Sequence, residues 1–457
     1  IKPTYYQIEK PELDQSPPPR WDSIEQDMPH YGMGAIQTTR GCPYDCEFCD
    51  VIYLFGRRQR HKSIRTVIEE LRTMARFGYE WIFFCDDEFG GDRKYAKALL
   101  REIIEFNRTV DNRISYSSQM CIAAAGDPEF CELLAAANFE MVFVGIESAS
   151  AKSLEGANKL QNLRGDLLEN IHKLLSYGIG IRSGMIVGFD EDDEDIFETT
   201  YRFLQEACLP SVGIYMLMAP IGTRLWMRLM HEGRVVSLAK NKDLGPARRT
   251  LTNIIPKKMT RVQLYRGYHR LLTKVYSWES FAERICGFIS LAAGAPPRHQ
   301  PLEVDAEELI GGINAGAGAL EAAKKILSHA EKVAPHLIKR ARDLIVQHAR
   351  YYETIQGILA GLESNIAGEQ SGQIILERFT RAAPLPLSFK EELNRILPAV
   401  HRRVFVNLDD PSRAAEVLTD VFVEFLHRLG DAFERFEDHH IALLDELCDR
   451  NCAKYNG

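Results

Sequence analysis

The first half of the chain alternates short apolar runs, rich in β-branched and aromatic residues, with amphipathic stretches. This alternation constrains the fold more than any other feature, because strands separated by helices imply right-handed βαβ units and a parallel sheet. Six such strands fit an α/β fold, either a partial (β/α)6 barrel of the TIM type or an open doubly wound sheet. The expected strands are residues 35–38, 81–85, 114–120, 141–146, 181–189 and 212–218.

Helix start signals lie between these runs. Ser63 can cap a helix because its hydroxyl can accept from a free amide of the first turn, and the apolar residues behind it recur with helical spacing. Asp92 can begin a second helix, and Asp127, which a proline follows, can begin a third. Apolar stripes at 167–175 and 197–204 predict a fourth and a fifth helix.

The second half of the chain changes character. Residues 292–301 are rich in proline and glycine and predict a linker, and the sequence beyond residue 303 has a helical pattern. We therefore expect a partial (β/α)6 TIM-like barrel followed by a helical C-terminal domain. The expected domains are an N-terminal lead-in at 1–30, a core barrel at 31–230, connecting helices and a linker at 231–302, and the helical domain at 303–457.

Proline and glycine punctuate the helical domain. We expect Pro335 to kink or divide the first long helix, because proline removes a backbone donor and clashes with the preceding turn. We also expect Gly361, Gly368 and Gly372 to break the pattern further on, and another helix at 414–429.

Charge and hydropathy disfavour several classes of protein. The 457 residues carry 56 Lys and Arg against 64 Asp and Glu, a net charge of −8, which argues against a nucleic-acid-binding protein. There is no apolar run of about 18 residues and no secretory signal, so we expect no transmembrane segment and a cytoplasmic location. Because the first residue is Ile rather than Met, we expect an upstream segment to be missing.

Three of the ten cysteines lie within eight residues of one another. Cys42, Cys46 and Cys49 have the spacing C-x3-C-x2-C, and three thiolates can hold three irons of a cubane cluster while the fourth iron stays open to a small molecule. A zinc loop is the alternative, but structural zinc takes four ligands, and His30 and His61 are each twelve residues from the nearest cysteine. Chance clustering is a second alternative.

This loop resembles that of the radical S-adenosylmethionine (radical SAM) superfamily, which has the same spacing after its first strand and an aromatic residue, here Phe48, before the third cysteine. The resemblance extends over about residues 30–230. It implies a 4Fe–4S cluster on Cys42, Cys46 and Cys49, whose unique iron binds the amino and carboxylate groups of S-adenosylmethionine. One-electron reduction then splits the sulfonium to give a 5′-deoxyadenosyl radical, which abstracts hydrogen from the substrate.

The carboxyl ends of the strands add to this resemblance, because ligands of parallel α/β sheets bind there. The resemblance implies that acidic residues after the second strand accept the ammonium of the cosubstrate, and that Glu147 accepts its ribose hydroxyls. It also implies that the backbone of Ile186, in a G-x-I-x-G-x-x-E pattern, packs against adenine. The candidate cofactor-binding residues are Phe48, Asp86, Asp87, Glu88, Gln119, Glu147, Arg182, Ile186 and Ala219. No catalytic residue is assigned.

A narrower resemblance points to the cobalamin-associated branch, which includes the hopanoid methylases. It rests on residues 40–57, 86–87, 143–148, 186–190 and 253–257. Members of this branch usually have a cobalamin-binding Rossmann domain before the barrel. Here about thirty residues precede the barrel and no D-x-H-x-x-G signature occurs, so we expect cobalamin only if an upstream domain is missing.

The leading functional hypothesis is a radical enzyme that functionalises a C–H bond of a small molecule or lipid, with methylation as one outcome. The alternatives are transfer of a 3-amino-3-carboxypropyl group from S-adenosylmethionine and a non-catalytic iron–sulfur electron carrier. The expected partners are the substrate and a reductant such as flavodoxin or ferredoxin. We expect the helical domain to cover the mouth of the barrel and exclude water from the radical; the alternative is an independent bundle that serves oligomerisation.

Two other groups of residues could bind a metal ion or an anion. Cys448 and Cys452 are spaced for one helical face and lie near His439 and His440, so a soft-metal site is one reading and a pair of free thiols the favoured one. The basic run at 57–62 directly follows the cysteine loop; it is either an anion-binding segment or a solvated loop.

Overall fold

The computed structural model describes residues 10–111, 113–235, 250–300 and 302–382, together with 417, 421 and 446–450. The chain divides into two compact units. The first unit contains residues 1–186, 198–215 and 274–353, and the second contains residues 187–197, 216–273 and 354–457.

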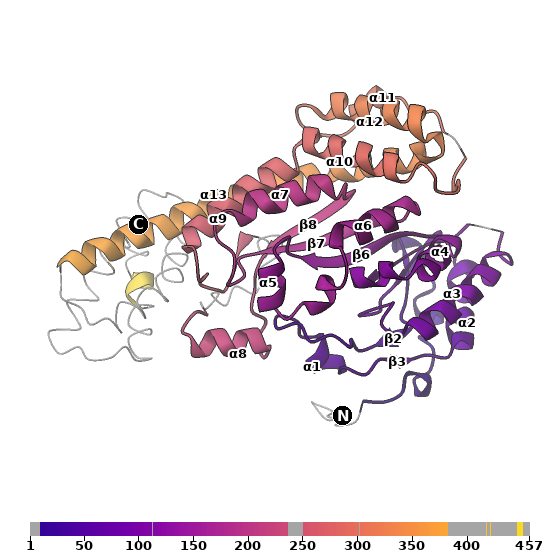
Figure 1. Ribbon diagram of the computed structural model, residues 1–457, viewed down its shortest axis with the longest axis horizontal. Helices are drawn as coiled ribbons and strands as arrows, with labels where there is room; N and C mark the ends of the chain where they lie inside the picture. Colours follow the sequence, from indigo (N-terminus) through magenta and orange to yellow (C-terminus); the bar gives the residue numbers. More distant parts are fainter. Residues whose placement is uncertain are drawn as a thin grey trace. The chain divides into compact units, whose positions relative to one another are not determined.

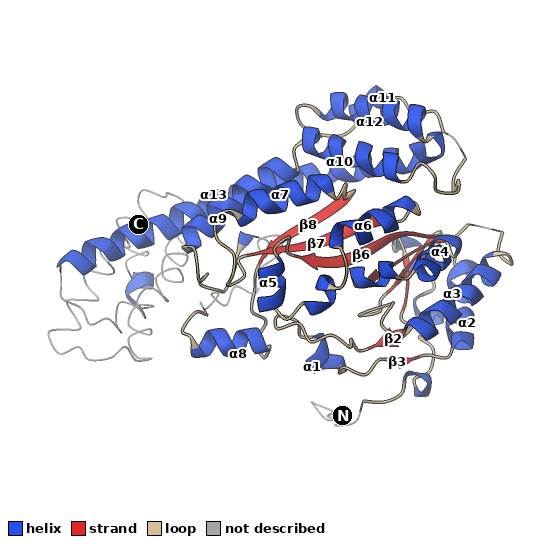
Figure 2. Ribbon diagram, viewed as in Figure 1, coloured by secondary structure: helices blue, strands red, loops and turns tan. Residues whose placement is uncertain are grey.

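One sheet, drawn in red in Figure 2, dominates the first unit. Its strands follow the order β1-β4-β5-β6-β7-β8. The four strand pairings from β1 to β7 are parallel, and Ile36 lies opposite Phe84 in the first of them. A doubly wound sheet would reverse direction from an interior strand, whereas here every strand lies beside the next one along the chain. The α/β prediction is confirmed, and the strand order is that of a partial (β/α)6 barrel. The strands are β1 (Gly34–Ile36), β4 (Trp81–Phe84), β5 (Ser115–Met120), β6 (Phe139–Glu147), β7 (Gly180–Val187) and β8 (Ser211–Met216).

The predicted helices follow these strands, and three of their N-caps are confirmed. Ser63, Asp92 and Asp127 each accept a hydrogen bond from a backbone amide of the first turn, a contact that stabilises a helix by about 1 kcal/mol. The five predicted helices are α2 (Ile64–Arg76), α3 (Arg93–Asn107), α4 (Pro128–Ala136), α6 (Leu167–Ser176) and α7 (Ile196–Glu206).

Short elements not predicted from the sequence surround the strand ends. An antiparallel pair, β2 with β3, brackets the cysteine segment, and three short helices follow β5 and β6. These elements are β2 (Thr39–Arg40), α1 (Val51–Phe55), β3 (Arg60–His61), η4 (Ile122–Gly126), α5 (Ala151–Gly156) and η5 (Leu160–Leu163). Three 3-10 turns precede the sheet: η1 (Leu13–Gln15), η2 (Trp21–Ile24) and η3 (Met28–His30).

An aromatic cluster forms part of the core beside the sheet. Phe84, Phe89, Tyr116 and Phe139 are buried, and their ring centroids lie 5.2–5.7 Å apart. Aromatic contacts of this kind add to the burial of apolar area. They anchor β4, β5 and β6, the three strands whose carboxyl ends carry most of the candidate residues.

The remaining helices of the first unit pack on one another, and α12 lies beside both α10 and α11 (Figure 1). Pro335 separates α12 from α13, as predicted. The elements are α10 (Trp278–Leu291), α11 (Ala306–Gly311), α12 (Ala319–Val333), η7 (Pro335–Leu337) and α13 (Ile338–Ala382), of which α13 continues into the second unit.

The glycines of the helical domain correct one expectation. Helix α13 runs unbroken through Gly361, Gly368 and Gly372. Glycine costs about 1 kcal/mol relative to alanine in a helix, but unlike proline it introduces no clash. A Cβ at Gly361 would lie 3.1 Å from the Thr250 side chain, so glycine here permits a close approach within the second unit.

The second unit also contains α8 (Arg224–His231) and most of α9 (Arg261–Val275). The Asn253 side chain accepts from the Ala219 amide and donates to the Ala219 carbonyl, both at 2.8 Å. Arg261 at the start of α9 forms an ion pair with Glu369 on α13. These contacts join separate segments of this unit.

Several expectations lie outside the described residues: most of 414–429, His439, His440 and Cys452. The domain boundaries and the role of the helical domain as a cover stay predictions. Within the described residues, no helix is both long enough and apolar enough to cross a membrane.

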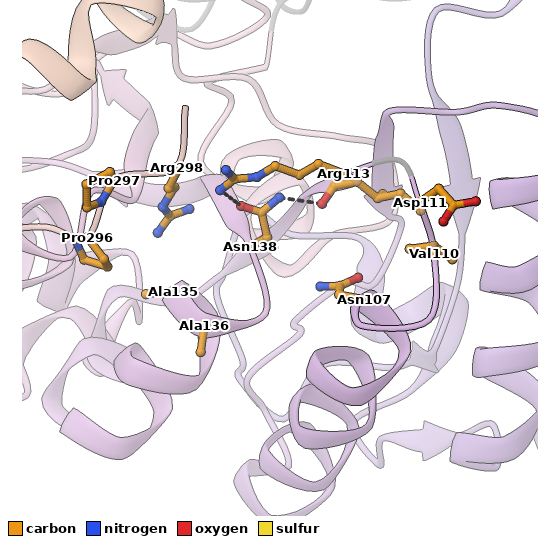
Figure 3. A pocket seen from close by; sticks show the side chains of 11 residues that line it. Asn107, Val110, Asp111, Arg113, Ala135, Ala136, Asn138, Pro296, Pro297 and Arg298 are labelled. Carbon is orange, nitrogen blue, oxygen red and sulfur yellow. Dashed lines mark hydrogen bonds between the residues drawn. The ribbon is translucent and has the colours of Figure 1, made fainter. Parts of the chain in front are cut away.

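A pocket of about 420 Å³ opens at the amino ends of β5 and β6 (Figure 3). Asn138 lies in its wall, accepting a hydrogen bond from Arg113 and donating one to the carbonyl of Ile114. Arg298 crosses from the predicted linker and donates to the Phe139 and Tyr177 carbonyls. The pocket is therefore at the opposite edge of the sheet from the strand ends that carry the cysteines.

Candidate functional site at the carboxyl ends of the strands

Asp86, directly after β4, is fully buried and ties together two strand ends. Its carboxylate accepts hydrogen bonds from the amides and hydroxyls of both Thr38 and Thr39, with the Thr38 amide at 2.6 Å. Burial raises the pKa of Asp86 to about 6, although these hydrogen bonds act in the opposite direction. Asp86 therefore holds the chain that leads from β1 into the cysteine loop.

Asp87 fixes the first turn of that loop. The Gly41 amide donates to Asp87 Oδ2 at 2.9 Å, and burial raises the pKa of this half-buried carboxyl group. Gly41 has a φ of 101°, and a Cβ there would lie 2.5 Å from the Arg58 carbonyl oxygen. Only glycine fits this position without displacing the backbone.

The three cysteines of the loop lie close enough to influence one another. Cys46 is buried, whereas Cys42 and Cys49 are partly exposed. Burial raises the pKa of Cys42 to about 12, and Cys46 and Cys49 contribute in the same direction. Backbone hydrogen bonds from Cys42 to Gly56 and from Cys49 to Cys46, both 3.2 Å, shape the loop around them.

The donor set of the cysteine loop matches the chemistry of an iron–sulfur cluster. Among the described residues, no three His, Cys, Asp or Glu side chains converge as the ligands of one metal ion do. The soft sulfur donors and their number, three on one short loop, suit a cluster with an open iron.

Glu88 is a buried carboxyl group between the cysteine loop and the end of β5. It is 5% exposed and accepts from the Cys121 amide at 3.0 Å. Burial raises the pKa of Glu88 to about 7. The backbone carbonyl of Gln119, near the end of β5, accepts a hydrogen bond from the Phe89 amide. This contact joins the end of β5 to the segment that carries Glu88.

Glu147 ends β6 in a strained conformation. Its φ is 66°, which is unusual for a residue other than glycine, and the register with β7 shifts between Gly145 and Glu147. Glu147 Oε1 forms an ion pair with Lys159 Nζ at 2.8 Å, with both side chains almost buried. The Lys159 ammonium also lies 6.0 Å from the ring centroid of Phe48.

Residues 157–162, which run from the end of α5 into η5, contact the cysteine loop and were not found from the sequence. Gln161 Nε2 donates to Cys46 Sγ at 3.2 Å, and the Glu47 amide donates to the Ala157 carbonyl at 3.0 Å. Asn162 donates to the Gly145 carbonyl at 2.9 Å. A polar run after a short helix resembles any surface loop, so sequence carried no specific signal for these contacts.

The remaining candidates lie on later strands. Arg182 is exposed in the middle of β7, opposite Phe143 of β6, whereas Ile186 is partly buried near the end of β7. Ala219 belongs to the second unit, where both of its backbone groups pair with Asn253. Direct contacts in the first unit thus link the cysteine loop to Asp87 and Gln161, and Glu147 to Lys159.

Two family profiles match the chain. One, described as the radical SAM superfamily, matches residues 36–204, and the other, a domain of unknown function named DUF4070, matches residues 223–323.

The chain is 37% identical over 207 residues to the hopanoid C-2 methylase of Rhodopseudomonas palustris, a match that covers 45% of this chain and 39% of that protein. It is 33% identical over 249 residues to an uncharacterized methyltransferase of Synechocystis, covering 54% of this chain and 46% of the relative. The matches thus span less than half of these relatives' lengths.

Among solved structures, the radical SAM methyltransferase TsrM from Kitasatospora setae, with cobalamin and a 4Fe–4S cluster bound, is similar at 18% identity and a TM-score of 0.45. That match covers 71% of this chain and 62% of TsrM.

Proposed function

Because this chain belongs to the radical SAM superfamily, whose members similar to it include methyltransferases, we propose that it is an enzyme of transferase type that acts on a C–H bond of a small molecule or lipid. Methylation is the favoured outcome. The supporting observation is the three-thiol loop, which the hydrogen bond from Gly41 to Asp87 holds at the carboxyl ends of the parallel strands.

Cys42, Cys46 and Cys49 would hold a 4Fe–4S cluster, which supplies the electron that cleaves the sulfonium of S-adenosylmethionine. Asp86 accepts hydrogen bonds from Thr38 and Thr39 and thereby holds the start of the loop in place. In this proposal Asp86 is therefore a support and not a cosubstrate ligand, unlike the expectation that all three acidic residues after β4 bind the cosubstrate.

The cosubstrate pocket in this proposal is lined by carboxyl groups. Asp87 and Glu88 would accept the ammonium and Glu147 the ribose hydroxyls, and Phe48 would lie beside them. Gln119, Arg182, Ile186 and Ala219 stay predicted contacts. A cytoplasmic flavodoxin or ferredoxin is the proposed electron donor, and cobalamin enters the proposal only if a cobalamin-binding domain accompanies this chain.

Product analysis tests the proposal. The chain is reconstituted anaerobically with iron and sulfide, reduced with dithionite, and incubated with S-adenosylmethionine that carries a deuterated methyl group. We expect 5′-deoxyadenosine by mass spectrometry, and S-adenosylhomocysteine as well if a candidate substrate is methylated. The Cys42→Ala/Cys46→Ala/Cys49→Ala variant is the control and should release neither.

The other outcomes favour the alternatives. Methylthioadenosine as the main product would replace the proposal with transfer of the aminocarboxypropyl group. A reducible cluster that leaves S-adenosylmethionine intact would indicate an electron carrier.

A further inference from the structure

Gln161 contacts a sulfur atom of the cysteine loop directly. Its Nε2 donates to Cys46 Sγ at 3.2 Å, within the range of a hydrogen bond to sulfur. Gln161 is 3% exposed and Cys46 is 7% exposed, so water competes little for either atom. An amide hydrogen bond to a ligand sulfur withdraws electron density from it.

Lys159 places a cation near the cysteine loop, 6.0 Å from the ring centroid of Phe48. Its ammonium pairs with Glu147 at 2.8 Å, and the two side chains are 12% and 9% exposed. Burial alone would lower the pKa of Lys159, but Glu147 and Cys46 outweigh burial and raise it. The ammonium is therefore charged while largely shielded from solvent, where a charge acts over a longer distance than in water.

The loop does not depend on these two side chains for its attachment. The Asn158 side chain donates to the Asp45 carbonyl, and the Glu47 amide donates to the Ala157 carbonyl at 3.0 Å. These contacts already join residues 157–158 to residues 45–47. The Gln161 side chain contacts the sulfur of Cys46, and the Lys159 side chain contacts the carboxylate of Glu147.

We propose that Lys159 and Gln161 raise the reduction potential of the cluster held through Cys46, and that Glu147 opposes them. This inference rests on the proposed function, since it requires a cluster on the three cysteines. Reduction adds one negative charge to the cluster. A buried cation and an N–H···S hydrogen bond both stabilise that added charge, whereas a nearby carboxylate destabilises it.

Potentiometric titration followed by electron paramagnetic resonance measures the effect on the reconstituted full chain. In Lys159→Met the cation is lost and Glu147 is left unpaired, so we expect reduction to become at least tenfold less favourable. This corresponds to a shift of about 59 mV to lower potential for a one-electron couple. Gln161→Leu should shift the potential in the same direction by less, and Glu147→Gln should raise it.

Three further variants separate charge from folding. Lys159→Arg keeps the charge, so its reduction potential should stay close to that of the wild type. Lys159→Met/Glu147→Gln removes both charges, so its reduction potential should also lie close to the wild-type value. Lys62→Met is the matched control, because Lys62 forms an equally buried ion pair with Glu70, at 2.7 Å, away from the cysteines. It should leave the potential unchanged.

Iron content and visible absorbance are measured first in every variant. Unchanged potentials in Lys159→Met and Gln161→Leu, with full clusters, would overturn this inference and leave the proposed function standing. A wild-type chain that assembles no cluster would overturn the proposed function itself.

Discussion

The Asp86 carboxylate binds Thr38 at both its backbone amide and its hydroxyl, and thereby fastens the end of β4 to the chain that leaves β1. Thr39 makes the same two contacts with this carboxylate, at 3.1 Å each. Four donors around one buried side chain leave it little capacity for a ligand. The first acidic residue after β4 therefore supports the strand ends, and the proposed contacts with the cosubstrate fall to Asp87 and Glu88.

Replacing Asp86 should destabilise the fold. Asp86→Ala leaves four buried donors without a partner, and we expect the free energy of unfolding to fall by about 3 kcal/mol, measured by urea denaturation. Asp127→Ala, which removes a helix N-cap, should cost only about 1 kcal/mol. If both variants lost the same free energy of unfolding, the hydrogen bonds of Asp86 would stabilise the fold no more than a single helix N-cap does.

Removing the three thiols should abolish the metal centre. We expect the triple alanine variant at Cys42, Cys46 and Cys49 to bind no iron after anaerobic reconstitution, as measured by iron content and electron paramagnetic resonance. Cys131→Ala removes a buried thiol of α4 instead and should keep the full signal. A complete cluster in the triple variant would disprove the assignment of the ligands.

Glu88→Gln should weaken cosubstrate binding while the cluster assembles normally. The amide can still accept from Cys121, but the negative charge opposite the proposed ammonium is lost. We expect a tenfold higher Kd for S-adenosylmethionine by equilibrium dialysis, about 1.4 kcal/mol. Glu140→Gln changes an equally buried carboxylate at the amino end of β6, where it pairs with His299, and should leave the Kd unchanged. Equal Kd values for wild type and Glu88→Gln would exclude this role.

Mild acid should destabilise the chain through His348. This ring stacks on Phe281 at 3.9 Å between centroids, and burial lowers its pKa to about 3, with Arg284 acting in the same direction. The unfolded state has a pKa near 6.5 and so binds the proton more tightly than the folded state below that pH. The contribution of the neutral ring to stability is complete above pH 6.5 and is lost as the pH falls from there toward 3.

Urea denaturation at pH 7.5 and 5.5 measures this effect. Relative to His348→Phe, we expect the wild type to lose about 1 kcal/mol of unfolding free energy between pH 6.5 and 5.5. The comparison between the two proteins is needed because the raised pKa values of Asp86 and Glu88 act in the opposite direction over this interval. His348→Phe keeps the stacking and removes the titration, so it should lose less over the same interval. An equal loss in both proteins would assign the pH dependence to other groups.

Local chemistry explains which parts of the fold could be predicted. Ser63, Asp92 and Asp127 begin helices where expected because an N-cap is decided within four residues. The glycines of α13 show the limit of local rules, since that helix continues through Gly361, where the approach of Thr250 favours a small residue. A low propensity was outweighed by contacts distant in the sequence.

The candidate site divides in the same way. The cysteine spacing and the acidic residues after β4 are visible in the sequence because each is a short motif on one segment. Gln161 lies 115 residues from Cys46, and the sequence holds no sign that they meet. The role of Asp86 as a support depends on Thr38 and Thr39, which lie 48 and 47 residues away in the sequence.

The sequence by itself determined the alternation of strands and helices, the helix starts and the three-thiol motif, because these depend on residues a few positions apart. Only the tertiary structure decided the strand order, the burial of Glu88, the ion pair between Glu147 and Lys159 and the amide that reaches Cys46. The physical reason is that burial and electrostatic contact depend on which segments meet at the carboxyl edge of the sheet. That meeting is set by packing of the whole unit and by no single stretch of chain.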